Sequence, residues 1–248
     1  MIGCENTPPK LGRTVFDALS GLGIPAPHGL DEISVSLAEY GFAAAGTELY
    51  LPELHALLGL RWEMARRTVL NVIEKLVSPV PGSRFLVGVT HRPFLKSVPE
   101  ALVGLGVKHA LVVQAIEGSD EAPLDGNSSL VRVRSDGFET LCVRPESLGL
   151  TRATRAHIPW KGAQDEEQAV LEALGGGRGP VKDLLLYNAA LRLWAADGSA
   201  PLEEHAERVR SVLDAGEALD LLDRLRPAGL PVASPGQAVS TSAASFSP

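Results

Sequence analysis

The most restrictive feature of this 248-residue sequence is an alternation of short apolar runs with a helical segment between them. Residues 85–90 (FLVGVT) and 109–116 (HALVVQAI) are apolar enough to form buried strands, and residues 93–106 between them have helical spacing. Two further runs, 129–134 and 138–143, flank the turn sequence Ser-Asp-Gly. This order predicts an α/β fold: a mostly parallel sheet flanked by helices, with an added antiparallel β pair.

Helical periodicity covers most of the remaining chain. Residues 12–24 predict a helix that stops at a glycine, and residues 54–77 predict one long helix. Between them, residues 47–51 (TELYL) alternate in polarity as a strand does. The C-terminal third of the chain is predicted to be helical, with Pro180 and Pro201 in first turns, where a missing N–H costs nothing.

Composition is typical of a soluble globular protein. Apolar residues make up 45%, enough for a sizeable core, and the net charge of −7 argues against a surface that coats nucleic acid. No apolar run reaches the ~18 residues of a membrane span, and two cysteines form no disulfide framework. We therefore expect a cytoplasmic protein, with one domain over residues 1–226 and a disordered Ser- and Ala-rich tail over 227–248.

Two adjacent carboxylates, Asp120 and Glu121, follow the second predicted strand by four residues. Open α/β sheets bind ligands beyond the carboxyl ends of their strands, and Mg²⁺ takes one or two carboxylates together with substrate phosphates. A metal site is therefore one interpretation, and a solvated surface loop is the other. Spacing alone favours the surface loop.

Three arginines, Arg61, Arg66 and Arg67, fall within seven residues of the predicted long helix. One interpretation is a charged helix face, on which Glu63 pairs with Arg66 or Arg67 at helical spacing. Another is contact with the phosphates of a nucleic acid. The helix pattern alone favours the charged face.

Three segments together resemble anthranilate phosphoribosyltransferase and its glycosyltransferase family 3. Residues 66–80 (RRTVLNVIEKLVSPV) are similar to the family segment R-T-x-x-N-x-L-x-x-L-x-x-P. Residues 118–121 (GSDE) are similar to its G-x-D-E metal-binding motif, and residues 188–194 (NAALRLW) to its closing helices. The segments agree in order and spacing over roughly residues 3–226, which favours the metal interpretation of the acidic residues.

This resemblance implies a reaction and a set of roles. The family transfers a phosphoribosyl group from phosphoribosyl pyrophosphate to an aromatic amine in tryptophan biosynthesis. It implies that Asp120 and Glu121 hold Mg²⁺, and that Arg61 and Asn6 orient an aromatic carboxylate acceptor, since a guanidinium fork binds a carboxylate through two hydrogen bonds. No general base is evident, so the implied catalysis relies on positioning and charge stabilisation.

The sequence departs from the family on the donor side. It contains no glycine-rich G-T-G-G-D loop and no preceding helical domain, and residues 3–6 (GCEN) stand where the family has K-H-G-N. The family serine that helps hold the diphosphate corresponds to Val15. We therefore expect a fragment or a degenerate member with poor turnover. Family members form homodimers through the helical domain, so the resemblance leaves the oligomeric state undecided.

A DNA-binding paralogue of the family gives the alternative function. The paralogue carries R-W-x-M-x-x-R and then V-S-H-P, and this chain has RWEMARR (61–67) and VTHRP (89–93). This likeness implies a non-catalytic nucleic-acid-binding protein whose contacts come from Arg61, Arg66 and Arg67. The paralogue lacks the acidic residues Asp120 and Glu121, which this chain keeps.

Overall fold

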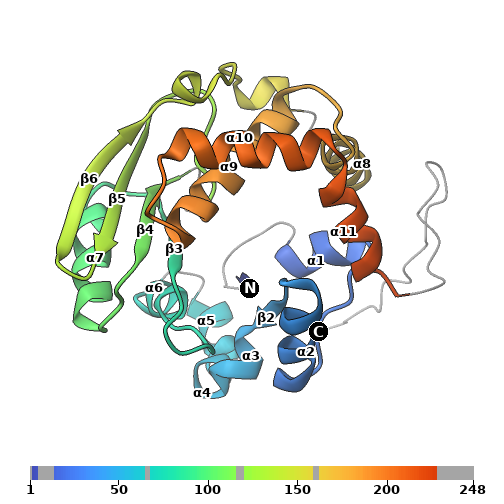
Figure 1. Ribbon diagram of the computed structural model, residues 1–248. Coiled ribbons are helices and arrows are strands. Elements are labelled where there is room, and N and C mark those ends of the chain that lie inside the picture. Colours follow the sequence, from blue (N-terminus) through green and yellow to red (C-terminus); the bar gives the residue numbers. More distant parts are fainter. Residues whose placement is uncertain (1, 5–13, 65–67, 116–119, 159–161, 228–248) are drawn as a thin grey trace.

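The computed structural model describes residues 2–4, 14–64, 68–115, 120–158 and 162–227 (Figure 1). The strands in these residues are β1 (Ile2–Cys4), β2 (Ala44–Gly46), β3 (Phe85–Val89), β4 (Ala110–Gln114), β5 (Ser128–Arg134) and β6 (Gly137–Val143). The helices of the N-terminal half are α1 (Val15–Gly21), α2 (Leu30–Tyr40), α3 (Thr47–Tyr50), α4 (Pro52–His55), α5 (Leu58–Met64), α6 (Leu70–Ile73), the 3₁₀ turn η1 (Glu74–Leu76) and α7 (Phe94–Gly104). The later helices are η3 (Pro145–Leu148), η4 (Arg155–His157), α8 (Ala163–Leu174), α9 (Pro180–Ala196), α10 (Leu202–Asp214) and α11 (Glu217–Leu225).

The main sheet has the strand order β3-β4-β5-β6. Strands β3 and β4 are parallel, with Gly88 opposite Val113, and α7 forms the crossover between them. The pairings of β4 with β5 and of β5 with β6 are antiparallel. The predicted α/β class, the flanking helices and the antiparallel addition are therefore confirmed, in a sheet of mixed direction.

Both faces of the main sheet are covered. Successive side chains of a strand point to opposite faces, so Val112 of β4 packs with α7 whereas Leu111 and Val113 pack with α9 and α10. Figure 1 shows α7 on the outer face and α9 and α10 on the inner one. Burial on both faces explains why the β4 sequence is a continuous apolar run rather than an alternating one.

The prediction of a strand at residues 47–51 is wrong. Thr47–Tyr50 form the short helix α3, and Pro52 begins α4. Four residues of alternating polarity fit a helical turn as well as a strand, so tertiary packing decides between them. The strand of this region is instead β2, which pairs in parallel with β1 and carries no β-branched residue that would have indicated it.

The prediction of one long helix over residues 54–77 is also wrong, because the segment is divided into short helices. Just before α6, the Asn71 side chain accepts a hydrogen bond from the Thr68 N–H at 2.7 Å. The Thr68 hydroxyl accepts one from the Leu70 N–H at 3.3 Å. Such side chains compete for backbone groups and restart the chain as a new helix.

The C-terminal third is helical, as predicted. Pro180 lies in the first turn of α9, but Pro201 is the N-cap of α10 rather than a first-turn residue. Residues 175–179 (GGGRG) connect α8 to α9. Among the described residues, no helix combines the length and the apolar character needed to cross a membrane.

Candidate functional site

The acidic residues are held against helix α9 by a buried asparagine. The Asn188 carboxamide accepts a hydrogen bond from the Ala122 N–H at 2.7 Å and donates one to the Ala122 carbonyl at 3.1 Å. Only 4% of Asn188 is exposed. Because both backbone groups of Ala122 are engaged by one side chain, the position of the preceding Asp120 and Glu121 relative to α9 is fixed.

Helix α9 also supplies a cation to the segment that carries Asp120 and Glu121, which is called the acidic loop below. The Arg192 Nη2 donates to Oδ2 of Asp120 at 2.6 Å, and its Nη1 donates to the Asn188 carbonyl at 3.3 Å. Asn188 and Arg192 are four residues apart, so they lie on the same face of the helix. Both members of the ion pair are partly exposed, 41% for Arg192 and 46% for Asp120. The acidic loop is thus anchored by two side chains of one helix.

The acidic residues offer carboxylate oxygens, which are ligand atoms suited to Mg²⁺. Within the described residues, no three His, Cys, Asp or Glu side chains gather in one place. Mg²⁺ needs no such group, since it keeps several waters and binds one or two carboxylates plus substrate phosphates. Arg192 engages Oδ2 of Asp120, and Glu121 is the adjacent carboxylate of the motif. The residues therefore fit a weakly held Mg²⁺ completed by phosphate oxygens.

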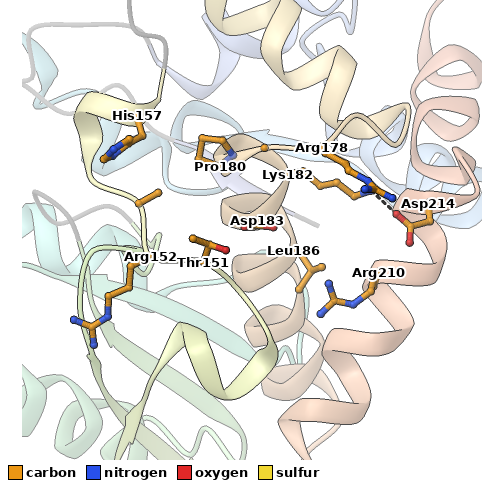
Figure 2. A pocket seen from close by; sticks show the side chains of 12 residues that line it. Thr151, Arg152, His157, Arg178, Pro180, Lys182, Asp183, Leu186, Arg210 and Asp214 are labelled. Atoms are coloured by element: carbon orange, nitrogen blue, oxygen red, sulfur yellow. Dashed lines mark hydrogen bonds and ion pairs between the residues drawn. The ribbon is translucent and has the colours of Figure 1, made fainter.

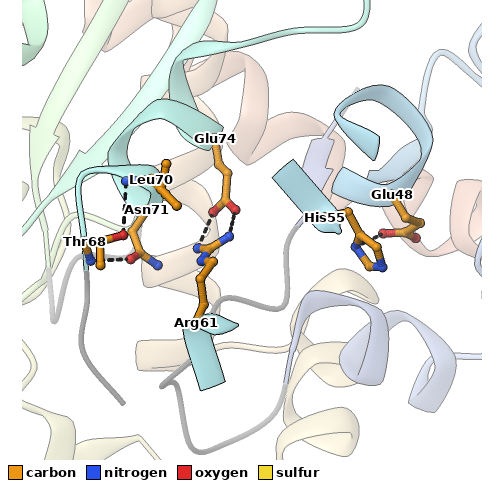
Figure 3. Close-up of polar contacts among 7 residues, drawn as sticks. All are labelled: Glu48, His55, Arg61, Thr68, Leu70, Asn71 and Glu74. Atoms are coloured by element: carbon orange, nitrogen blue, oxygen red, sulfur yellow. Dashed lines mark hydrogen bonds and ion pairs between the residues drawn. The ribbon is translucent and has the colours of Figure 1, made fainter. Parts of the chain in front are cut away.

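Arg61 lies in a buried ion pair. Its two terminal nitrogens face the two carboxylate oxygens of Glu74, and the Nη2–Oε2 distance is 3.1 Å (Figure 3). Both side chains are 2% exposed. The Arg61 Nε has no hydrogen-bond partner among the described atoms. The guanidinium fork that was expected to meet an acceptor carboxylate therefore already binds a carboxylate of the same chain.

The acidic loop and the Arg61–Glu74 ion pair are attached to the same end of the sheet. Next to Glu74, the Lys75 ammonium donates to the Gly88 carbonyl near the carboxyl end of β3, at 3.3 Å. Gly88 is opposite Val113 of β4, the strand that precedes the acidic loop. Since β3 and β4 are parallel, their carboxyl ends lie at one edge, which is where α/β proteins bind ligands.

The other predicted site residues, Asn6, Arg66 and Arg67, lie outside the described residues. Their assignments, to an acceptor or to a nucleic acid, stay predictions. Of the arginine cluster only Arg61 is described, and its burial against Glu74 keeps it from a phosphate backbone in this conformation.

The sequence matches a known protein family. The family model described as "Glycosyl transferase family, a/b domain" matches residues 14–219. The chain belongs to this family. An anthranilate phosphoribosyltransferase of Thermomicrobium roseum is 34% identical over 213 residues, which is 85% of this chain and 61% of the relative. That of Symbiobacterium thermophilum is 34% identical over 216 residues, covering 85% and 62%.

Solved structures show the same fold. Anthranilate phosphoribosyltransferase from Thermus thermophilus superposes with a TM-score of 0.78 at 28% identity, over 90% of this chain and 66% of that one. The Saccharomyces cerevisiae protein in complex with PRPP and Mg superposes with a TM-score of 0.77 at 18% identity, over 90% and 62%, which shows the fold. The chain thus spans about three fifths of the length of these relatives.

Three site residues of this glycosyl transferase family member were missed in the sequence. Asn188 and Arg192 lie in the segment NAALRLW, which the sequence showed only as a likeness to the family's closing helices. Their four-residue spacing was the available signal, because it places a carboxamide and a guanidinium on one helix face. Glu74 lies 13 residues after Arg61, and no local periodicity connects the two.

Proposed function

We propose that this chain is the α/β part of a phosphoribosyltransferase resembling anthranilate phosphoribosyltransferase. The donor would be phosphoribosyl pyrophosphate, the acceptor an aromatic amine, and the pathway tryptophan biosynthesis. The family membership and two relatives of 34% identity support the reaction class. The chain spans about three fifths of those relatives, so their complete activity is proposed only together with the portion of them that this chain does not cover.

The single observation that carries the proposal is the anchored acidic loop. A solvated surface loop needs no buried asparagine to hold it, yet the Asn188 carboxamide forms two hydrogen bonds with the backbone of Ala122, next to Glu121. An anchored loop holds two carboxylates in a fixed position at the carboxyl edge of the sheet, where a phosphorylated ligand of this fold class binds. The Saccharomyces cerevisiae relative forms a complex with PRPP and Mg, which is consistent with this placement.

The proposed reaction forms a bond between the acceptor nitrogen and the anomeric carbon of the ribose, while the bond from that carbon to the diphosphate oxygen breaks. The amine loses a proton, and the diphosphate leaves with the electron pair. Mg²⁺ supplies charge neutralisation on the departing diphosphate. Asp120 and Glu121 would hold the cation, while Asn188 fixes their loop and Arg192 orients the Asp120 carboxylate. The reaction then depends on positioning and electrostatics.

The acceptor part of the proposal rests on the family resemblance. Arg61 and Asn6 would orient the acceptor, with Arg61 binding its carboxylate. Glu74 competes for the same guanidinium, because a fork that binds one carboxylate through both nitrogens has no second set of parallel donors. We therefore expect this chain to bind an aromatic carboxylate weakly, and to turn over slowly for lack of the family's glycine-rich loop in its 248 residues.

The metal site is tested by isothermal titration of phosphoribosyl pyrophosphate with and without Mg²⁺. We expect weak binding that strengthens with Mg²⁺, and loss of this Mg²⁺ effect in the double variant Asp120→Asn, Glu121→Gln. The matched control is Glu203→Gln, Glu204→Gln, which neutralises two adjacent exposed acids of α10. If both double variants change the Mg²⁺ effect equally, the acidic loop is no metal site.

The acceptor role of Arg61 is tested by Glu74→Gln. This isosteric change removes the competing charge but keeps one acceptor oxygen for the guanidinium. An increase in anthranilate affinity relative to the unmodified chain supports the acceptor role. Unchanged affinity in a folded Glu74→Gln protein would mean that the ion pair is structural alone.

A further inference from the structure

A cavity of about 590 Å³ lies away from the acidic loop. It is bounded by the segment 151–157, the first turn of α9 and the facing side of α10 (Figure 2). Lys182 in its wall is ten residues before Arg192 on α9, which is about 15 Å at the rise of an α-helix. Ligand pockets of drug-sized molecules have volumes of roughly 300–1,000 Å³. The cavity is therefore large enough for a small molecule and distinct from the proposed metal site.

The wall of this cavity is cationic, although the whole chain carries a net charge of −7. Four permanent cations and two carboxylates line it, namely Arg152, Arg178, Lys182, Arg210, Asp183 and Asp214. The cations come from three separate parts of the fold. A concave surface with an excess of one charge sign concentrates ligands of the opposite sign.

Three of the cations converge beside one carboxylate. Lys182 is 8% exposed, and its ammonium donates to Asp214 and, at 3.1 Å, to the Gly176 carbonyl. The hydrogen bond from Lys182, followed by the charges of Lys182, Arg210 and Arg178, lowers the pKa of the Asp214 carboxyl. Arg210 also pairs with Glu207 at 3.3 Å, so two carboxylates face three cations and positive charge remains at this end of the cavity.

Donor groups remain for a ligand. Within the described part of the chain, no hydrogen-bond acceptor contacts the Arg178 guanidinium, which lies beside Lys182 and Asp214 in Figure 2. An ammonium has three N–H groups, and that of Lys182 has two acceptors. Arg210 uses Nη2 for the Leu148 carbonyl at 2.8 Å and Nε for Glu207 at 3.3 Å, which leaves Nη1. Arg152 is turned outward to Glu146, so we do not count it.

The remaining wall fits an organic group. Ala153, Pro180 and Leu186 give it an apolar part. The cavity is far larger than an inorganic phosphate, so it has room for an organic group as well. A phosphate has several oxygens that could accept hydrogen bonds from three residues at once, whereas a carboxylate has only two oxygens. The first turn of the 17-residue helix α9, capped by Gly179 without a side-chain hydrogen bond, adds the positive end of a helix dipole.

We propose that this cavity binds a small organic phosphate through Arg178, Arg210 and Lys182. The site is independent of the proposed transferase chemistry, because it contains none of the residues assigned to the metal or the acceptor. The phosphate end would lie between Arg178 and Arg210, and the organic part against Leu186.

The experiment is isothermal titration in EDTA, so that metal-dependent binding at the acidic loop does not contribute. The probes are ribose 5-phosphate, inorganic phosphate and acetate. We expect ribose 5-phosphate to bind most tightly and acetate most weakly. Tighter binding of inorganic phosphate than of ribose 5-phosphate would mean an ion site without an organic subsite and would overturn the proposal, as would equal binding of acetate.

Two variants with opposite expected effects guard against loss of folding. Arg178→Ala should weaken ribose 5-phosphate binding about tenfold, since a charge-assisted hydrogen bond is lost. Asp183→Asn should strengthen it about threefold, because a negative charge leaves the wall. The matched control is Arg208→Ala, which removes an exposed arginine of α10 outside the cavity. Equal effects of Arg178→Ala and Arg208→Ala, or no strengthening in Asp183→Asn, would overturn the proposal.

Discussion

Removing one partner of the buried Arg61–Glu74 ion pair should destabilise the protein far more than removing both. Each side chain is 2% exposed, so Glu74→Leu leaves a guanidinium without a counter-charge inside the fold. Breaking a buried pair in this way costs about 3–5 kcal/mol. Domains are stable by only about 5–15 kcal/mol, so the single variant would lose roughly a fifth or more of a typical free energy of unfolding.

The double variant Arg61→Met, Glu74→Leu separates the cost of an unpaired charge from the worth of the pair. Apolar side chains of similar size need no counter-charge, and such replacements are neutral or stabilising by about 1–4 kcal/mol. We therefore expect the double variant to be as stable as the unmodified chain or more stable, with a coupling energy of several kcal/mol between the positions. Restored stability in the double variant is the signature of a paired buried charge.

The assay is urea unfolding followed by circular dichroism, with thermal melts as a second measurement. For a chain of this size, 3–5 kcal/mol corresponds to a decrease in Tm of roughly 6–20 °C. Arg192→Met is the matched control, because its ion pair with Asp120 is partly exposed and should contribute only about 0–1 kcal/mol. A Glu74→Leu protein that unfolds at the same urea concentration as Arg192→Met would refute the assignment of Glu74 as the buried partner of Arg61.

Three further predictions concern the acidic loop and the basic cavity. Asn188→Ala should lower the free energy of unfolding by about 2–3 kcal/mol in urea, because the buried Ala122 N–H and carbonyl lose their partners; an effect below ~0.5 kcal/mol would contradict the anchoring role. EDTA should abolish the Mg²⁺ enhancement of phosphoribosyl pyrophosphate binding in the unmodified chain and change nothing in Asp120→Asn. Hydrogen bonding from Lys182 lowers the pKa of Asp214 in the folded state, so its stabilising contribution is present above the unfolded pKa of ~3.9 and is lost as the pH falls through the folded value. The stability difference between the unmodified chain and Asp214→Asn should therefore shrink from pH 5 to pH 3, and a difference that grows instead would reverse the assignment.

The sequence predicted those parts of the fold that depend on local spacing. The strands β3 and β4, the crossover α7 and the antiparallel strands β5 and β6 were all indicated by apolar runs and a turn sequence. Residues 47–51 were wrongly predicted as a strand, and residues 54–77 wrongly as one helix. In both cases the local pattern fits two conformations, and packing or a capping side chain selects one.

The candidate site was predicted only in part. Asp120 and Glu121 stood out as carboxylates after a strand, and the structure places them beside α9 at the carboxyl edge of the sheet. Arg61 was assigned to an acceptor carboxylate from the family resemblance, but the structure gives it Glu74 as a partner. An arginine that looks available in a sequence can be fully engaged by a carboxylate that the periodicity does not connect to it.

The sequence by itself determined the α/β class, the family resemblance and the presence of an acidic motif after a strand. Only the tertiary structure decided which charges are paired, since Arg61 meets Glu74 across 13 residues and Asp120 meets Arg192 across 72. Local spacing specifies neighbours within about one helical turn or one strand repeat. Partners farther apart are determined by how the backbone segments pack, and packing also sets how deeply each ion pair is buried.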